Sequence, residues 1–320
     1  MASRGDVLIS GASVAGPTLA FWLQRFGWRP IVVERSPALR RGWGGHAVDL
    51  FGPAVDIAEQ MGILPDILQA RTRTELISLV RPGKRPVDID FTRLVAGIAD
   101  HHVEVMRGEL AGILHEATRH DVEYIFGDRI RGLTQTDGAV EVTFDHATAR
   151  RFDLVVGADG LHSIVRHLTF GEESRFRRYL GGHLAVYTVP NRLQLHGRML
   201  TYLTPGRLAA TYPVWQTGQA RAAFLFRHPR EFDAHHRDID RQKTAAPRRL
   251  RRPRWRGPPP ARRPGPSRGL LLRLDQPDRH GPRTRAGSTC RAGTAFSPLY
   301  EAVRASIRRS SLMYMPPSLR

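Results

Sequence analysis

Two glycines and one glutamate near the start of the chain have the spacing of a dinucleotide phosphate site. They lie in the segment DVLISGASVAGPTLAFWLQRFGWRPIVVERS. Gly11 allows a sharp turn after an apolar run, Gly16 allows a helix to pack closely on a sheet, and the first helical amides can receive a pyrophosphate. Glu34, 18 residues after Gly16, can accept hydrogen bonds from a ribose without a phosphate. Ser13 replaces the middle glycine of the GxGxxG pattern.

A second segment with chemical potential is RRFDLVVGADGLHSIVRHL, residues 150–168. An apolar strand is followed there by Gly157, Ala158, Asp159 and Gly160, and then by a helix that carries Ser163 and Arg166.

The elements that must position these residues follow from apolar spacing. Residues 7–10 and 31–34 read as buried parallel strands, and residues 16–26 have helical spacing, which together make a βαβ unit. Residues 75–91 alternate around a Pro82-Gly83 turn and predict a hairpin. Residues 174–228 alternate between turns and predict a further sheet, whose aromatic residues could line a pocket or belong to the core: Tyr187, Tyr202, Tyr212 and Phe224.

The Asp-Gly-x-x-Ser-x-Val-Arg pattern from Asp159 to Arg166 resembles the second fingerprint of the FAD-dependent aromatic monooxygenases, the para-hydroxybenzoate hydroxylase-like flavoproteins. The βαβ unit, the Glu34-Arg35 pair, GGHAVDL (44–50) and VEVMRGELAGIL (103–114) occur in the family's order. The last two segments are most similar to the tetracycline-degrading branch. The resemblance covers residues 1–240.

The resemblance implies an α/β fold, with a three-layer Rossmann-like FAD-binding domain and a second, β-rich substrate domain. It implies FAD contacts at matching positions, which are Gly11, Ala12, Ser13, Val14, Ala15, Gly16, Glu34, Arg35, Asp49, Arg107, Asp159 and Gly160. Arg166 would hold the Asp-Gly turn, and Arg40 and Arg41 lie near the expected nicotinamide contact. From the residues alone, Asp49 reads as a structural carboxylate and Arg107 as a solvated helix charge.

The implied activity is a monooxygenase reaction. NADH or NADPH would reduce FAD, and one atom of O2 would be transferred to an aromatic or polyketide-like small molecule. Such a reaction requires no protein nucleophile, because the flavin carries the chemistry. We therefore predict cofactor-binding residues and no catalytic residue. His46 replaces an expected glutamine or small residue, and a lone histidine is more often structural. The pair His235-His236 with nearby aspartates matches no zinc spacing and predicts a solvated turn, so no metal is expected.

Charge divides the chain into two parts. The 320 residues hold 49 Lys and Arg against 30 Asp and Glu, a net charge of +19. Residues 1–240 hold 29 basic and 27 acidic side chains, whereas residues 241–320 hold 20 and 3. We therefore predict an FAD domain over 1–73 and 97–172, a substrate domain over 74–96 and 173–240, and a tail over 241–320.

The tail has several interpretations. Residues 241–292 contain 9 prolines and no Val, Ile, Phe, Tyr or Met, which predicts disorder. A nucleic-acid arm would rest on charge alone, so nucleic acid is disfavoured as a partner. The genetic code permits codons for segments of the tail that, when read one nucleotide later, encode helix-like and strand-like sequences resembling the family. This favours a shift of the reading frame near Lys243. Gly293-Thr294-Ala295 is then a poor replacement for the family's third, Gly-Asp motif, and a non-catalytic remnant is the alternative function.

The cysteine count and the length of the apolar runs indicate the cellular compartment. Cys290 is the single cysteine, which makes a reducing compartment the default. No apolar run approaches the ~18 residues of a membrane span. We therefore expect a cytoplasmic protein with no membrane partner.

Overall fold

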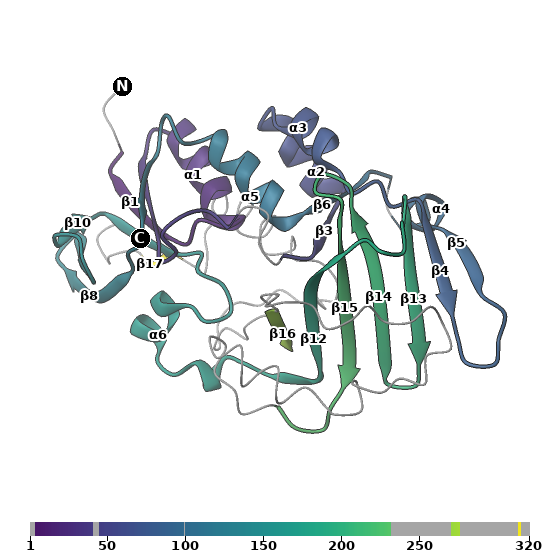
Figure 1. Cartoon of the computed structure of the whole chain (residues 1–320). Coiled ribbons are helices and arrows are strands. Elements are labelled where there is room, and N and C mark those ends of the chain that lie inside the picture. The colour runs from purple at the N-terminus through teal and green to yellow at the C-terminus, as the bar shows by residue number, and fades with distance from the viewer. Residues whose placement is uncertain (1–3, 41–44, 99, 232–269, 276–312, 315–320) are drawn as a thin grey trace.

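The computed structural model describes residues 4–40, 45–98, 100–231, 270–275 and 313–314. A five-stranded sheet lies with helices α1 (Ala15–Arg25) and α5 (Arg107–Glu116) in one part of the molecule, and a seven-stranded sheet forms the other part (Figure 1). Strands β3 and β6 lie between these two parts (Figure 1). The arrangement is a mixed α/β fold, as the sequence predicts.

The five-stranded sheet confirms the predicted βαβ unit. Its order is β17-β11-β1-β2-β7, and the pairs β1–β11, β1–β2 and β2–β7 are parallel, whereas β11 and β17 pair antiparallel. The strands are β1 (Asp6–Ser10), β2 (Arg29–Glu34), β7 (Glu123–Phe126), β11 (Leu154–Gly157) and β17 (Met313–Tyr314). Val7, Leu8 and Ile9 are fully buried, because a parallel sheet is covered on both faces.

Six helices are described, and α1 joins β1 to β2. They are α1 (Ala15–Arg25), α2 (Gly52–Gln60), α3 (Leu64–Ala70), α4 (Phe91–Ala96), α5 (Arg107–Glu116) and α6 (Ile164–Phe170). A short 3-10 turn, η1 (Glu173–Arg175), follows α6. One apolar cluster packs α1, α2, α3 and α5 against the antiparallel pair β3 (Ala47–Phe51) and β6 (His102–Met106), with Leu50, Ile67 and Leu110 at its centre.

The apolar run before the Asp-Gly turn is divided between two sheets. Strand β10 (Arg150–Phe152) joins β8 (Ile130–Thr136) and β9 (Ala139–Phe144) in a three-stranded antiparallel sheet, whereas β11 joins the five-stranded sheet. Asp153 lies between β10 and β11, where the chain passes from one sheet to the other. Its carboxylate accepts the Asp6 amide at 2.7 Å, and its own amide donates to the Asp6 carbonyl at 3.0 Å.

The seven-stranded sheet confirms both predicted β regions. Its order is β16-β12-β15-β14-β13-β4-β5, and only β13 and β4 pair in parallel. The hairpin strands are β4 (Leu76–Val80) and β5 (Val87–Asp90), and the later strands are β12 (Tyr179–Pro190), β13 (Arg198–Thr204), β14 (Arg207–Val214), β15 (Gln219–Arg227) and β16 (Leu270–Asp275).

Strand β16 falls within the tail for which the sequence predicts disorder. Its sequence LLLRLD is an apolar run, and such a run can pair with the edge of β12, as Leu184 does with Leu272. The other residues of the tail except Met313 and Tyr314 lie outside the described residues. So do Arg41, His235-His236 and Gly293-Thr294-Ala295.

The described residues include neither a membrane-spanning helix nor a metal-binding cluster of side chains. No described helix is long and apolar enough to cross a membrane. The described side chains contain no group of three or more His, Cys, Asp or Glu that could hold a metal ion.

Candidate functional site

The turn between β1 and α1 requires glycine at both predicted positions. Gly11 has φ +111°, and a Cβ there would lie 2.5 Å from the Ala158 carbonyl oxygen. A Cβ at Gly16 would lie 1.9 Å from the Gly11 carbonyl oxygen. Helix α1 begins after Val14 with no side-chain cap and no acidic residue in its first turn. This uncapped helix start can receive an anion.

Glu34 at the end of β2 reaches back to this turn. Its carboxylate accepts the Ala12 amide at 3.0 Å and the Ser36 amide at 2.9 Å. Burial opposes the charged carboxylate, but these hydrogen bonds outweigh burial and lower the pKa of Glu34. The carboxylate is therefore ionised near neutral pH and has further lone pairs for a ligand hydroxyl.

A shallow surface hollow brings several of the predicted residues together. Its walls include Ala12, Ser13, Glu34, Arg40 and Arg107. Burial lowers the pKa of Arg107, and the nearby positive charge of Arg40 lowers it further. The hollow thus holds two guanidinium groups and one carboxylate, which suits a ligand with both phosphate and hydroxyl groups.

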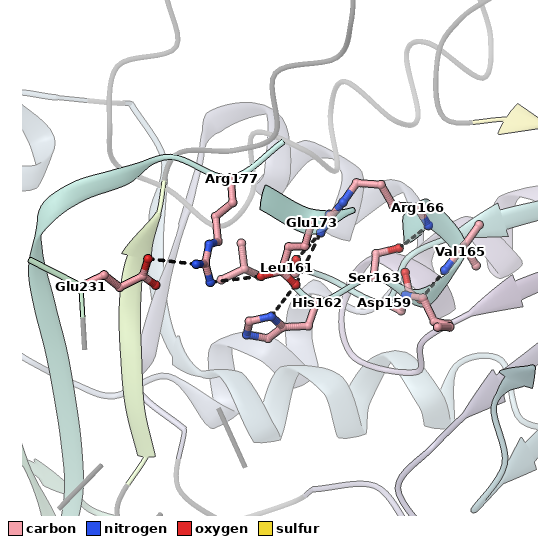
Figure 2. A network of polar contacts seen from close by, with 10 residues as sticks. Asp159, Leu161, His162, Ser163, Val165, Arg166, Glu173, Arg177 and Glu231 are labelled. Atoms are coloured by element: carbon pink, nitrogen blue, oxygen red, sulfur yellow. Dashed lines mark hydrogen bonds and ion pairs between the residues drawn. The ribbon is translucent and has the colours of Figure 1, made fainter. Parts of the chain in front are cut away.

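The Asp-Gly turn after β11 lies under the β1–α1 turn, and Figure 2 shows its polar contacts. Asp159 Oδ2 accepts the Ile164 amide at 2.8 Å, the Val165 amide at 3.3 Å and the Ser10 hydroxyl at 3.2 Å. Asp159 Oδ1 is buried and has no hydrogen-bond partner among the described residues. Gly160 has φ +79°, and a Cβ there would meet open space. The turn offers a free acceptor beside room for a ligand.

A polar network that the sequence did not predict links this turn to the seven-stranded sheet (Figure 2). Glu173 contacts His162 Nδ1 at 2.8 Å and Arg177 Nη1 at 3.1 Å, and Arg177 Nη2 donates to Glu231 at 2.9 Å. Burial opposes ionisation of Glu173, but His162 and the arginines lower its pKa. Arg166 is buried and donates to the Leu161 carbonyl, which fits its predicted role in holding the turn.

Asp49 and Arg35 do not line the hollow. Asp49 lies on β3 and pairs with His102 Nε2 at 2.7 Å, a structural role that the sequence alone favours. Arg35 is exposed directly after β2. Their contacts with a flavin stay predictions.

The four aromatic candidates are divided between the two faces of the seven-stranded sheet. Tyr187 and Phe224 have ring centroids 6.0 Å apart, and Phe224 and Tyr202 are each paired with Ala209, which places these three on one face. Tyr212 lies on the opposite face, is 6% exposed, and accepts the Ala47 amide at 3.3 Å. The four residues therefore do not form one pocket.

Arg221 on β15 is a buried polar residue that sequence reasoning missed. It is paired with Tyr212 in the sheet register, is 2% exposed, and donates from Nε to the Gly45 carbonyl at 3.3 Å. The available signal is an arginine between small residues in the apolar strand QARAAFLFR.

Most of the chain matches known flavoproteins. The family model described as FAD binding domain matches residues 4–254. The uncharacterized protein Rv1260 of Mycobacterium tuberculosis (strain ATCC 25618 / H37Rv) is 40% identical over 251 residues, covering 78% of this chain and 67% of that protein. A flavin-dependent monooxygenase of Legionella longbeachae serogroup 1 (strain NSW150) is 34% identical over 227 residues, covering 71% and 58%.

Among solved structures, tetracycline destructase Tet(51) superposes with a TM-score of 0.65 and 32% identity, covering 76% of this chain and 61% of that one. The chain therefore spans about three fifths of the length of the monooxygenase and of the destructase.

Proposed function

Because this chain belongs to the FAD-binding domain family that includes flavin-dependent monooxygenases, we propose that it is an FAD-dependent monooxygenase. It would use NADH or NADPH and O2 to hydroxylate an aromatic or polyketide-like small molecule. The observation that carries the proposal is the convergence of Ala12, Ser13, Glu34, Arg40 and Arg107 on one hollow.

The described residues fit FAD. The turn from Gly11 to Gly16 would receive the pyrophosphate at the start of α1, because this helix has no side-chain cap and no acidic residue in its first turn. Glu34 would accept hydrogen bonds from the adenosine ribose. Asp159 Oδ1, a buried acceptor that has no partner among the described residues, would accept one from a hydroxyl of the ribityl chain.

The protein's share of the reaction is binding and orientation. Bound FAD would supply the redox chemistry, taking electrons from the nicotinamide and passing one oxygen atom of O2 to the substrate, with the other leaving as water. Arg107 and Arg40 would balance the negative charge of the ligand. The seven-stranded sheet would hold the substrate and exclude water from the reacting atoms.

The substrate class rests on similarity. Tet(51) is named for tetracycline, and this chain shares 32% identity with it, which supports a polyketide-like or other aromatic substrate. We also propose the cytoplasm as the compartment, because the chain has one cysteine and nicotinamide cofactors are expected there.

The first experiment is a visible absorption spectrum of the purified 320-residue chain before and after addition of FAD. We expect a yellow protein with one bound flavin per chain. NADH and NADPH oxidation with oxygen uptake would then be measured with and without candidate aromatic substrates. A protein that binds FAD but oxidises neither nicotinamide would indicate the non-catalytic remnant, and a folded protein that remains colourless would contradict the proposal.

A further inference from the structure

Glu173, in the short turn η1, contacts basic side chains from three parts of the chain (Figure 2). Its carboxylate lies 2.8 Å from His162 Nδ1 in the Asp-Gly turn, 4.0 Å from Arg166 Nη2 in α6 and 3.1 Å from Arg177 Nη1 just before β12. These four side chains are between 8% and 31% exposed, so solvent screens their attraction less than it screens ion pairs on the surface. One carboxylate therefore holds three segments of the chain together.

The segment held through His162 directly follows Asp159, whose Oδ1 is the acceptor that we propose for the ribityl chain. Gly160 has φ +79°, and a Cβ there would meet nothing within 4 Å, so side-chain packing does not fix this part of the turn. The contact between the His162 ring and Glu173 reaches the turn from η1. Because residues 160–162 adjoin the acceptor, this contact influences how a ligand hydroxyl approaches it.

The same network continues from Glu173 to the seven-stranded sheet (Figure 2). Arg177 contacts Glu173 through Nη1 and donates from Nη2 to Glu231 at 2.9 Å. Arg177 lies just before β12 and Glu231 just after β15, and these two strands pair antiparallel from Gly182 opposite Arg227. One guanidinium thus joins two carboxylates at this end of the strand pair, a geometry for which the forked donors of arginine are suited.

The charge of Glu173 is what holds the network together. Burial opposes ionisation of this carboxyl, but His162, Arg177 and Arg166 together lower its pKa, so it is ionised near neutral pH. Removal of one charge from a partly buried network leaves its partners desolvated without compensation. A neutral side chain at this position would therefore release the turn and the strand pair from each other.

We propose that Glu173 is a positioning residue for FAD, which holds the Asp-Gly turn ready for the ribityl chain and links it to the end of the β12–β15 pair. The inference rests on the proposed function and deepens it. When FAD fixes the turn, the network should also order the strand pair. Because coupling between two sites is reciprocal, a ligand that orders the sheet should in turn strengthen FAD binding.

A purely structural ion-pair network predicts a different behaviour. It would stabilise the protein equally with and without FAD, and its loss would speed local opening of the sheet in both states. The change in sheet opening that FAD causes is therefore the quantity that distinguishes coupling from structural support.

The test is amide hydrogen exchange of the full chain with and without FAD, together with the dissociation constant of FAD from flavin fluorescence. The variants Glu173→Gln and Glu231→Gln each remove one charge and keep the size of the side chain. Glu123→Gln is the matched control, because Glu123 pairs with Arg150 at 2.7 Å outside this network. Strands β4 and β5 of the same sheet serve as the internal reference for exchange.

In the wild-type protein, FAD should slow exchange in β12 and β15 about threefold more than in β4 and β5. Glu173→Gln should abolish this difference and raise the FAD dissociation constant about threefold. Glu231→Gln, which cuts only the link to the sheet, should abolish the difference with a smaller rise in the dissociation constant. Glu123→Gln should behave as the wild-type protein does.

An equal effect of FAD on β12 and β15 in wild type and Glu173→Gln would overturn the inference, because the carboxylate would then be structural only. If Glu173→Gln does not fold, the wild-type exchange and the Glu231→Gln variant decide the outcome. Bound FAD without slower exchange in wild-type β12 and β15 would contradict this inference alone. A folded wild-type chain that binds no FAD would contradict the proposed function and this inference with it.

Discussion

The turns after β1 and β11 leave adjacent parallel strands of one sheet, and both contain glycine, but their helices begin differently. Helix α1 has no side-chain cap, whereas Ser163 caps α6 and Asp159 accepts its first amides. An uncapped start attracts anions, and a start closed by a carboxylate repels them. The first turn is therefore suited to phosphate and the second, with its free Asp159 Oδ1, to hydroxyl groups. This difference in capping supports our proposal that the first turn binds the pyrophosphate of FAD and the second binds hydroxyl groups of its ribityl chain.

The largest effect should come from filling the first turn. In Gly16→Ala the new Cβ would overlap the Gly11 carbonyl, so the turn must open. We expect loss of FAD binding and a free energy of unfolding lower by about 1–3 kcal/mol. Flavin fluorescence titration and thermal melting by circular dichroism measure these. Gly52→Ala is the control, since a Cβ there meets nothing within 4 Å; equal losses in both variants would refute the role of the turn.

A smaller effect should follow from giving α1 the carboxylate that α6 has. Val14→Asp and Val14→Asn lose the same packing and can both cap the helix. Only the aspartate opposes a bound phosphate, so we expect it to bind FAD about tenfold more weakly than the asparagine variant. The two dissociation constants are compared at low and high salt. If they agree at low salt, the uncapped start is not the anion site.

Two roles in the second turn can be separated by mutation, namely the cap that Ser163 gives to α6 and the acceptor Asp159 Oδ1 that has no partner among the described residues. Asp159→Asn keeps an oxygen for the α6 amides but replaces the free acceptor with an amide group, and should weaken FAD binding roughly fivefold, or about 1 kcal/mol. Ser163→Ala should lower the free energy of unfolding by about 1 kcal/mol and leave FAD affinity unchanged. Titration and melting of both variants test this separation; the reverse pattern would show that Asp159 acts only as a cap.

The smallest effect concerns the carboxylate that joins the first turn to β2. Folding lowers the pKa of Glu34 below its ordinary value of 4.5. The ionised carboxylate therefore stabilises the folded protein fully above pH 4.5, and this stabilisation is lost as the pH falls through the pKa of the folded state. The difference in melting temperature between wild type and Glu34→Gln should thus be constant from pH 7 to 5 and shrink below pH 4.5. Exposed Glu59→Gln should show no such change.

The sequence predicted the first turn well because backbone geometry demands particular residues there. A Cβ at Gly11 or Gly16 would overlap a main-chain carbonyl oxygen, so only glycine fits at these positions. The fully buried run Val7–Ile9 indicates a parallel strand. The hairpin and the strands of the seven-stranded sheet were likewise predicted by alternation and by Pro-Gly and Thr-Gly turns.

Side-chain convergence was harder to predict. Arg221 and Gly45 lie 176 residues apart, and Arg177 and Glu231 lie 54 apart. The first contact depends on how the seven-stranded sheet meets residues 45–47, and the second on the pairing of β12 with β15, neither of which a local pattern records. The same limit explains the aromatic residues, because the register alone decides that Tyr212 faces away from Tyr187 and Phe224.

The seven-stranded sheet is fastened to the rest of the protein through main-chain atoms. Arg221 binds the Gly45 carbonyl, Tyr212 the Ala47 amide, and Trp215 the Arg71 carbonyl at 2.7 Å. Main-chain groups persist when side chains are exchanged. The side chains of residues 45–47 and 71 can therefore change while these attachments are kept, so the two parts of the protein stay joined as the sequence drifts.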